Sequence, residues 1–284
     1  MYTDSAMSDR AYLTIVRYPS AFTSADRAAA LSEALGIDAF HAAQRASHEP
    51  PLVLARVNAA EAPQIVARLK ARRISAFALT QAYLKAHPRP FLVKRLVPAL
   101  GCDEPMYMAE PWRGEPTGLR TADLFLIVRA AIDKVRTSID IETTGGLRSG
   151  YSYGYGGPEL PDPPTPLRST ERKTTHILDL WLRDGSRLRC NADRLSFDVL
   201  GQERGMTDLE NTDRLALRLA TEAPQAQIDT GFRGFRVPAD LRRDLTSAFG
   251  TQTESDNAAA FDFYSIWTHT IHRGLARATP TDPA

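Results

Sequence analysis

The feature that most constrains the fold is a hairpin signal in the second half of the chain, THILDLWLRDGSRLRCN (residues 175–191). Its residues alternate with the two-residue period of a strand. The alternation puts His176, Leu178, Leu180 and Leu182 on one face, and Ile177, Asp179, Trp181 and Arg183 on the other. Asp184-Gly185 is a preferred pair for the tight turn of a hairpin, and the returning strand then carries Leu188 and Cys190. The chain must therefore contain an antiparallel sheet, and we expect this hairpin at the edge of a meander.

Further strand and helix signals surround the hairpin. Phe91 to Val97 and Met106 to Trp112 are rich in residues that favour strands. Asp123 to Glu142 mixes β-branched residues with a partly helical period, and we predict mainly strand. A helix follows, with Thr207 or Asp208 as N-cap and an end at Pro224. Its apolar stripe consists of Leu209, Leu215 and Leu219.

The first ninety residues predict a separate unit with the order β-α-α-β-α-β. The expected strands are Ala11 to Pro19, Pro50 to Val57 and Ser75 to Thr80. The first helix begins after Thr23 or Ser24 and ends at Gly36, and the second runs from Ile37 to Ala46. For the third helix, Asn58 as N-cap and Glu61 three residues later form a capping-box pattern. Such short strands need helices on one face of the sheet, and the two prolines of QAYLKAHPRP predict a linker with a domain boundary near residues 82–90.

The pattern of ALGIDAFHAAQRASHEPPLVLARVNAAEAPQIVARLKARRISAFAL resembles the C-terminal domain of the bacterial ribosomal stalk protein over roughly fifty residues. The resemblance implies a small α/β sandwich for residues 1–88. In stalk proteins the short helix carries lysines that recruit translation factors, whereas the matching positions here are Phe40 and Ala43. The resemblance therefore implies the fold without the translational function.

Residues 89–225, with several antiparallel strands followed by one amphipathic helix, resemble a pleckstrin-homology-like β barrel. The whole chain, with LRCNADRLSFDVLGQERG between the hairpin and the helix, also resembles a bacterial two-domain family of unknown function. The two resemblances imply an α+β fold and an interaction module, but they name no activity. Residues 226–284 form a helical C-terminal extension in this scheme, with a short helix after Pro238 and a longer one from Asp256 or Asn257 to near Gly274.

Composition places the chain among ordinary folded proteins. It has 284 residues, 43% hydrophobic and 24% charged, and a net charge of +1. With so small a net charge, no overall electrostatic field attracts the chain to nucleic acid or to an anionic membrane. Two distant cysteines, Cys102 and Cys190, fit a reducing compartment. The sequence has no run of eighteen apolar residues, so we expect a cytoplasmic protein with no membrane span.

A long segment, residues 143–174, lacks periodicity and contains GGLRSGYSYGYGG and PDPPTP. Tyr151, Tyr153 and Tyr155 lie at i, i+2 and i+4, so they share one face of an extended chain. With Arg148 they are the candidate partner-binding residues, for a protein or for stacking on single-stranded nucleic acid. The alternative, which composition favours, is a mobile insertion with loosely packed rings.

A search for catalytic and metal chemistry finds only weak candidates. His269 and His272 are three residues apart on the last helix, but no further ligand follows at zinc spacing. Phe261, Tyr264, Trp267 and Ile271 recur on that helix at a spacing typical of a core. Asp193 and Asp198 are a candidate acid and base pair, although ordinary turn and cap roles explain them much better. We expect no catalytic residue, metal or cofactor.

The sequence KARR places Lys70, Arg72 and Arg73 at the end of the third helix. These cations either contact a phosphate or offset the helix macrodipole, and the second explanation suits so short a cluster better.

The sequence therefore predicts a non-catalytic interaction or scaffold protein with a protein partner. An enzyme with an unrecognised site and a single-stranded nucleic-acid binder are the alternatives. A cleft with convergent acids or histidines of perturbed pKa favours the enzyme, and a basic stripe continuous with Arg148 favours nucleic acid.

Overall fold

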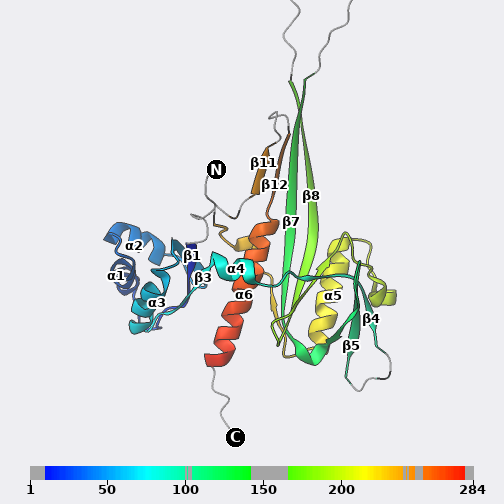
Figure 1. The fold of residues 1–284 in the computed structure, drawn as a ribbon, viewed down its shortest axis with the longest axis horizontal. Coiled ribbons are helices and arrows are strands. Elements are labelled where there is room, and N and C mark those ends of the chain that lie inside the picture. Colours follow the sequence, from blue (N-terminus) through cyan, green and yellow to red (C-terminus); the bar gives the residue numbers. More distant parts are fainter. Residues whose placement is uncertain are drawn as a thin grey trace, which may run out of the picture.

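The computed structural model describes residues 10–99, 101, 104–141, 166–238, 241, 243–246 and 252–278. The fold is mixed α+β, as the sequence predicts, with a small and a large sheet on opposite sides of the last helix (Figure 1).

The small sheet has the predicted element order. Its strands are β1 (Arg10–Arg17), β2 (Leu52–Asn58) and β3 (Ser75–Thr80), arranged β2-β1-β3 with both pairs antiparallel. The helices are α1 (Ser24–Leu35), α2 (Ala39–Ala46) and α3 (Ala62–Ala71). They cover one face, where Leu13 and Ile15 of β1 pack with Leu31 and Leu69.

The ends of α1 and α3 show which local sequence signals determine where a helix begins and ends. Thr23 and Asp26 form a capping box at the start of α1, and Gly36 ends the helix with a left-handed φ of 65°. The capping box expected for α3 is wrong, because Asn58 accepts a hydrogen bond from the backbone of Ala60 and α3 begins only at Ala62, with Glu61 as its N-cap. A proline in its first turn, where a missing N–H does no harm, favours that later start.

The expected linker contains a short helix. Thr80 caps α4 (Gln81–Ala86) by accepting a hydrogen bond from the backbone of Tyr83. The chain then enters the large sheet.

In the described part of the chain, the large sheet has nine strands. They are β4 (Phe91–Pro98), β5 (Met106–Pro111), β6 (Thr117–Arg120), β7 (Leu124–Ile141), β8 (Pro166–Leu182), β9 (Arg187–Asn191), β10 (Gln227–Asp229), β11 (Arg243–Thr246) and β12 (Gln252–Asp256). Their order is β11-β12-β7-β8-β9-β4-β5-β6, and β10 pairs with β7 in parallel. Among the described residues, short 3-10 helices lie in the connections at Thr121–Asp123, Asp198–Glu203 and Gly231–Gly234.

The described strands do not close into a barrel, which corrects the barrel expected for residues 89–225. Strands β11 and β12 extend the sheet beyond β7, so β6 lies at the opposite end of the strand order and does not return to β7. The helix expected after Pro238 is also wrong for Arg243–Thr246, which form β11. Pairing with β12 overrides the local preference of that segment for helix.

The hairpin predicted for residues 175–191 exists, but it lies in the middle of the sheet and not at a meander edge. Strand β8 pairs with β7 on one side and with β9 on the other. It begins at Pro166, so residues 166–174, expected within the long loop, are strand. The far ends of β7 and β8 project beyond the helices (Figure 1).

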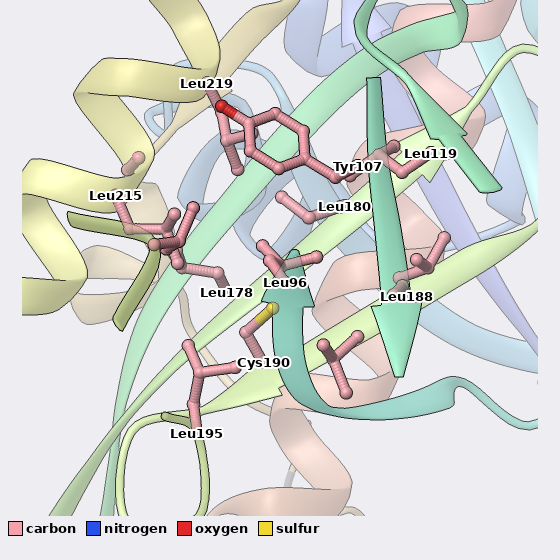
Figure 2. Close-up of a cluster of buried hydrophobic side chains, with 14 of the residues drawn as sticks. Leu96, Tyr107, Leu119, Leu178, Leu180, Leu188, Cys190, Leu195, Leu215 and Leu219 are labelled. Carbon is pink, nitrogen blue, oxygen red and sulfur yellow. The ribbon is translucent and has the colours of Figure 1, made fainter. Parts of the chain in front are cut away.

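Helix α5 (Asp208–Glu222) covers one face of the large sheet. Thr207 and Glu210 form its capping box. Leu215 and Leu219 pack against Leu178, Leu180 and other buried side chains of the sheet (Figure 2). Leu209, predicted in the same stripe, is exposed.

Helix α6 (Ala258–Ala278) lies between the two sheets. The predicted stripe of Phe261, Tyr264, Trp267 and Ile271 is buried, as a core stripe should be. Phe263 and Ile266 on other sides of the helix are buried too, which is the pattern of a helix enclosed all round. None of the described helices is long and apolar enough to span a membrane.

Candidate functional site

A pocket of about 480 Å³ lies between the small sheet, α6 and the segment that follows β10. Small-molecule sites occur preferentially in clefts of this size where two units meet. The lining residues come from three parts of the chain: Val16 and Pro51; Asp229, Gly231, Gly234 and Phe235; and Tyr264, Trp267, Thr268, Ile271, His272 and Leu275.

Three rings form much of the wall. The ring centroids of Phe235 and Tyr264 are 4.9 Å apart, those of Phe235 and Trp267 5.1 Å, and those of Tyr264 and Trp267 5.6 Å. The indole N–H of Trp267 donates to the buried Thr14 hydroxyl of β1 at 2.9 Å, which fixes the ring against the small sheet. The wall is therefore aromatic, and Trp267 within it is fixed to β1.

Asp229 supplies the carboxylate of the pocket. Its Oδ1 accepts hydrogen bonds from the Tyr264 hydroxyl at 2.5 Å and from the backbone N–H of Gly231 at 3.0 Å. A Cβ at Gly231 would lie 2.6 Å from the Tyr264 oxygen, so this close approach requires glycine. Within the described parts of the chain, no Arg or Lys side chain forms an ion pair with Asp229.

Burial and hydrogen bonding set the protonation states around Asp229. Burial raises the pKa of Tyr264, and its hydrogen bond to Asp229 raises it further, so the phenol keeps its proton as donor. Burial lowers the pKa of His272, although the nearby Asp229 opposes that shift. Beside the Asp229 carboxyl, these shifts favour a protonated phenol and a neutral imidazole in the pocket.

The opposite side of α6 carries a buried ionic network, composed of Asp179, Arg187, Arg189, Asp262 and Ser265. Asp179 of β8 is fully buried and receives two hydrogen bonds from Arg189, at 2.6 and 2.7 Å. Arg187 and Ser265 also donate to Asp179, at 3.4 and 2.6 Å. Arg189 reaches Asp262 of α6 at 2.7 Å.

The charges of opposite sign pair with one another, which is the condition for burying charge, although Arg187 Nε is buried without a hydrogen-bond partner. We interpret the network as an attachment of α6 to the large sheet. The cross-strand pairing of Asp179 with Arg189, and of Trp181 with Arg187, follows from the register around the Asp184-Gly185 turn. A sequence search for opposite charges directly across that turn would have found the first pair.

The structure describes only some of the site residues predicted from the sequence, and it does not bring the predicted acid and base pair together. Arg148, Tyr151, Tyr153 and Tyr155 lie outside the described residues. Asp193 and Asp198 do not pair as acid and base; Asp193 lies 3.8 Å from Lys173, and Asp198 lies 3.8 Å from Arg204.

The two histidines of α6 face different surroundings. His269 stacks on Trp181 with centroids 4.0 Å apart, whereas His272 lines the pocket. Among the residues the structure describes, no group of three or more His, Cys, Asp or Glu side chains is placed to hold a metal ion.

Comparison with known proteins found no match to a family model, to a curated protein or to a solved structure. The pocket's residues are therefore the basis for a functional proposal.

Proposed function

We propose that the protein is a non-catalytic interaction protein that binds a cationic side chain of a protein partner in the pocket between α6 and the small sheet. The observation that carries the proposal is the Asp229 carboxylate, which has no cation partner in the described structure and faces a pocket walled by three rings. Aromatic faces attract organic cations, and a carboxylate in a partly desolvated site strengthens that attraction.

The arrangement also supports a preformed site. Asp229 is held by Tyr264 and by the Gly231 backbone, and Trp267 is held by Thr14. Side chains that are already fixed lose little conformational entropy when a ligand binds. A lysine side chain, with an apolar stem and a charged end, fits a pocket that is aromatic along its wall and acidic at one point.

The test uses Nα-acetyl-lysine amide as probe and its Nε-acetylated counterpart as the uncharged control. Titration of the full chain, followed by the chemical shift of the Trp267 indole, should show saturable binding of the charged probe alone. Asp229→Asn should weaken that binding at least about tenfold, because a charged hydrogen bond contributes about 1.5–3 kcal/mol.

The matched control is Asp198→Asn, which changes the same type of residue at an exposed position away from the pocket. It should leave the affinity unchanged, and near-ultraviolet circular dichroism should show that both variants are folded. Equal binding of the two probes, or equal affinity of wild type and Asp229→Asn, would contradict the proposal.

One observation on the same pocket favours the alternative that the protein is an enzyme. Asp229, Tyr264 and His272 line one cleft, and the pKa values of Tyr264 and His272 are shifted in opposite directions, a pattern common at catalytic sites. A neutral His272 is able to accept a proton. Consumption of a bound amine, followed by mass spectrometry and lost in His272→Gln, would favour this function over simple binding.

The proposal also includes the two domain resemblances, the location and the partner-binding residues predicted from the sequence. The β-α-α-β-α-β order supports the stalk-like resemblance of residues 1–88, and the packing of α5 on antiparallel strands supports a pleckstrin-homology-like relationship without a closed barrel. The free, buried thiol of Cys190 supports a cytoplasmic location. The partner-binding role of Arg148 and the three tyrosines stays a prediction.

A further inference from the structure

A second hollow, of about 580 Å³, lies on the small-sheet unit where β1 ends and where α3 leads into β3. Two separate segments line it, Arg17, Tyr18, Pro19 and Ser20 from the end of β1, and Lys70, Arg73, Ile74 and Ser75 from the α3–β3 connection. It shares no lining residue with the pocket that contains Asp229.

The charges of this hollow are all positive. Arg17, Lys70 and Arg73 line it together, and no carboxylate does. None of the three forms an ion pair within the described residues, whereas the neighbouring Arg72 pairs with Glu33. All three side chains are exposed, so solvent screens much of their mutual repulsion, and an anion bound among them would offset the rest.

The macrodipole explanation that suits the sequence does not account for this arrangement. It explains cations at the end of α3, but Arg17 belongs to β1. The antiparallel pairing of β1 with β3 places Arg17 opposite Ser75 and so brings it to the hollow.

The backbone of Arg73 gives an independent observation. Its φ is +60°, in the left-handed region. The backbone N–H of Arg73 donates to Lys70 and that of Ile74 donates to Leu69, which is the helix-ending motif in which glycine is the usual residue. An arginine here strains the backbone relative to glycine, so helix termination alone does not explain this residue.

We propose that the hollow binds the phosphate group of a small phosphorylated compound. Two guanidinium groups are suited to paired hydrogen bonds with phosphate oxygens, and Lys70 adds a third charge. The hydroxyls of Ser20 and Ser75 line the same hollow and are further donors. Its volume leaves room for the organic part of the compound.

The test is calorimetry on the full chain at 0.15 M salt, with pyrophosphate and glycerol phosphate as probes and acetate as the singly charged control. Both phosphate probes should bind saturably and acetate should not. Arg17→Ala and Arg73→Gly should each weaken binding at least about tenfold. Arg72→Ala, which removes the same charge from the adjacent residue, should change the affinity less than about twofold.

Arg73→Gly also separates binding from stability. It should lose affinity while its melting temperature stays the same or rises, because glycine adopts the left-handed conformation without strain. If Arg17→Ala is destabilised, Arg17→Gln keeps much of the side-chain volume and tests the charge alone. Equal loss of affinity in Arg72→Ala and Arg73→Gly, or the absence of saturable phosphate binding, would overturn the proposal.

Discussion

Helix α6 contacts the two sheets in different ways. Toward the large sheet it presents Asp262 and Ser265, which join the buried charges of Asp179, Arg187 and Arg189. Toward the small sheet it presents rings: Phe263 lies 4.8 Å from Tyr12 between centroids, and Trp267 bonds to Thr14. The contact with the large sheet therefore combines apolar packing with an ionic network, whereas the contact with the small sheet is mainly apolar.

This difference predicts how each contact of α6 responds when side-chain groups are removed. A buried ionic network works only with all its members in place, because removing one leaves an uncompensated charge. Apolar contact has no fixed direction and decreases gradually as atoms are removed. We expect the contact with the large sheet to fix the position of α6, and the contact with the small sheet to adjust to it.

The largest expected effect is that of Asp179→Ala. The change strands Arg187 and Arg189 in the core, and breaking a buried pair in this way costs about 3–5 kcal/mol. Urea unfolding followed by circular dichroism measures it. Asp179→Leu combined with Arg189→Met, which replaces the pair by apolar groups, should recover much of the loss. A cost below about 1 kcal/mol for the single variant would show that the network does not hold α6.

The next effect is a dependence of stability on pH at the same side of α6. Burial, together with Arg273, His87, His272 and Arg187, lowers the pKa of His269 to about 4. Since an unfolded histidine titrates near 6.5, the unfolded state binds more protons between these values. The free energy of unfolding should fall as the pH drops from 6.5 to 4, by roughly 2–3 kcal/mol, and this contribution should level off below pH 4.

His269→Phe provides the comparison, because phenylalanine keeps a ring against Trp181 and cannot titrate. Its unfolding free energy should fall less over the same pH range than that of wild type. Identical pH profiles for the two proteins would show that His269 contributes nothing to acid sensitivity.

The smallest effect on stability is expected where the aromatic rings of α6 contact the small sheet. Trp267→Phe removes the indole donor and leaves the Thr14 hydroxyl buried without it, which should cost about 1–2 kcal/mol. Hydrogen exchange should become faster in β1 and remain unchanged in β8. Thr14→Val in the same background should return part of the stability. Faster exchange in both strands would mean that the two attachments are not separable.

Local signals were sufficient for much of the fold. The strand periods, the capping boxes at Thr23 and Thr207 and the glycine at Gly36 act within a few residues, so they are readable without the structure. Apart from the capping box expected for α3, the main failures are long-range. Strands β10 and β12 pair with β7 from more than ninety residues away in sequence, and no local pattern encodes that pairing. The domain boundary near residues 82–90 stays a prediction.

The candidate sites were less predictable than the fold for the same reason. Asp229, Phe235 and Tyr264 meet only because α6 packs beside the segment after β10. Arg17 meets Arg73 only through the pairing of β1 with β3. The sequence marked Lys70 and Arg73 as a basic cluster, but it gave no sign that Arg72, between them in the same run, turns away to Glu33.

The position of α6 in chain order has a consequence for biosynthesis. The helix follows every other described element, yet it supplies the shared core of both sheets. While the ribosome is still translating the residues before Ala258, Tyr12 and Leu79 on one sheet and Trp181 on the other have no helix to cover them. Both sheets therefore expose apolar surface until late in synthesis, the condition in which nascent chains bind chaperones or aggregate.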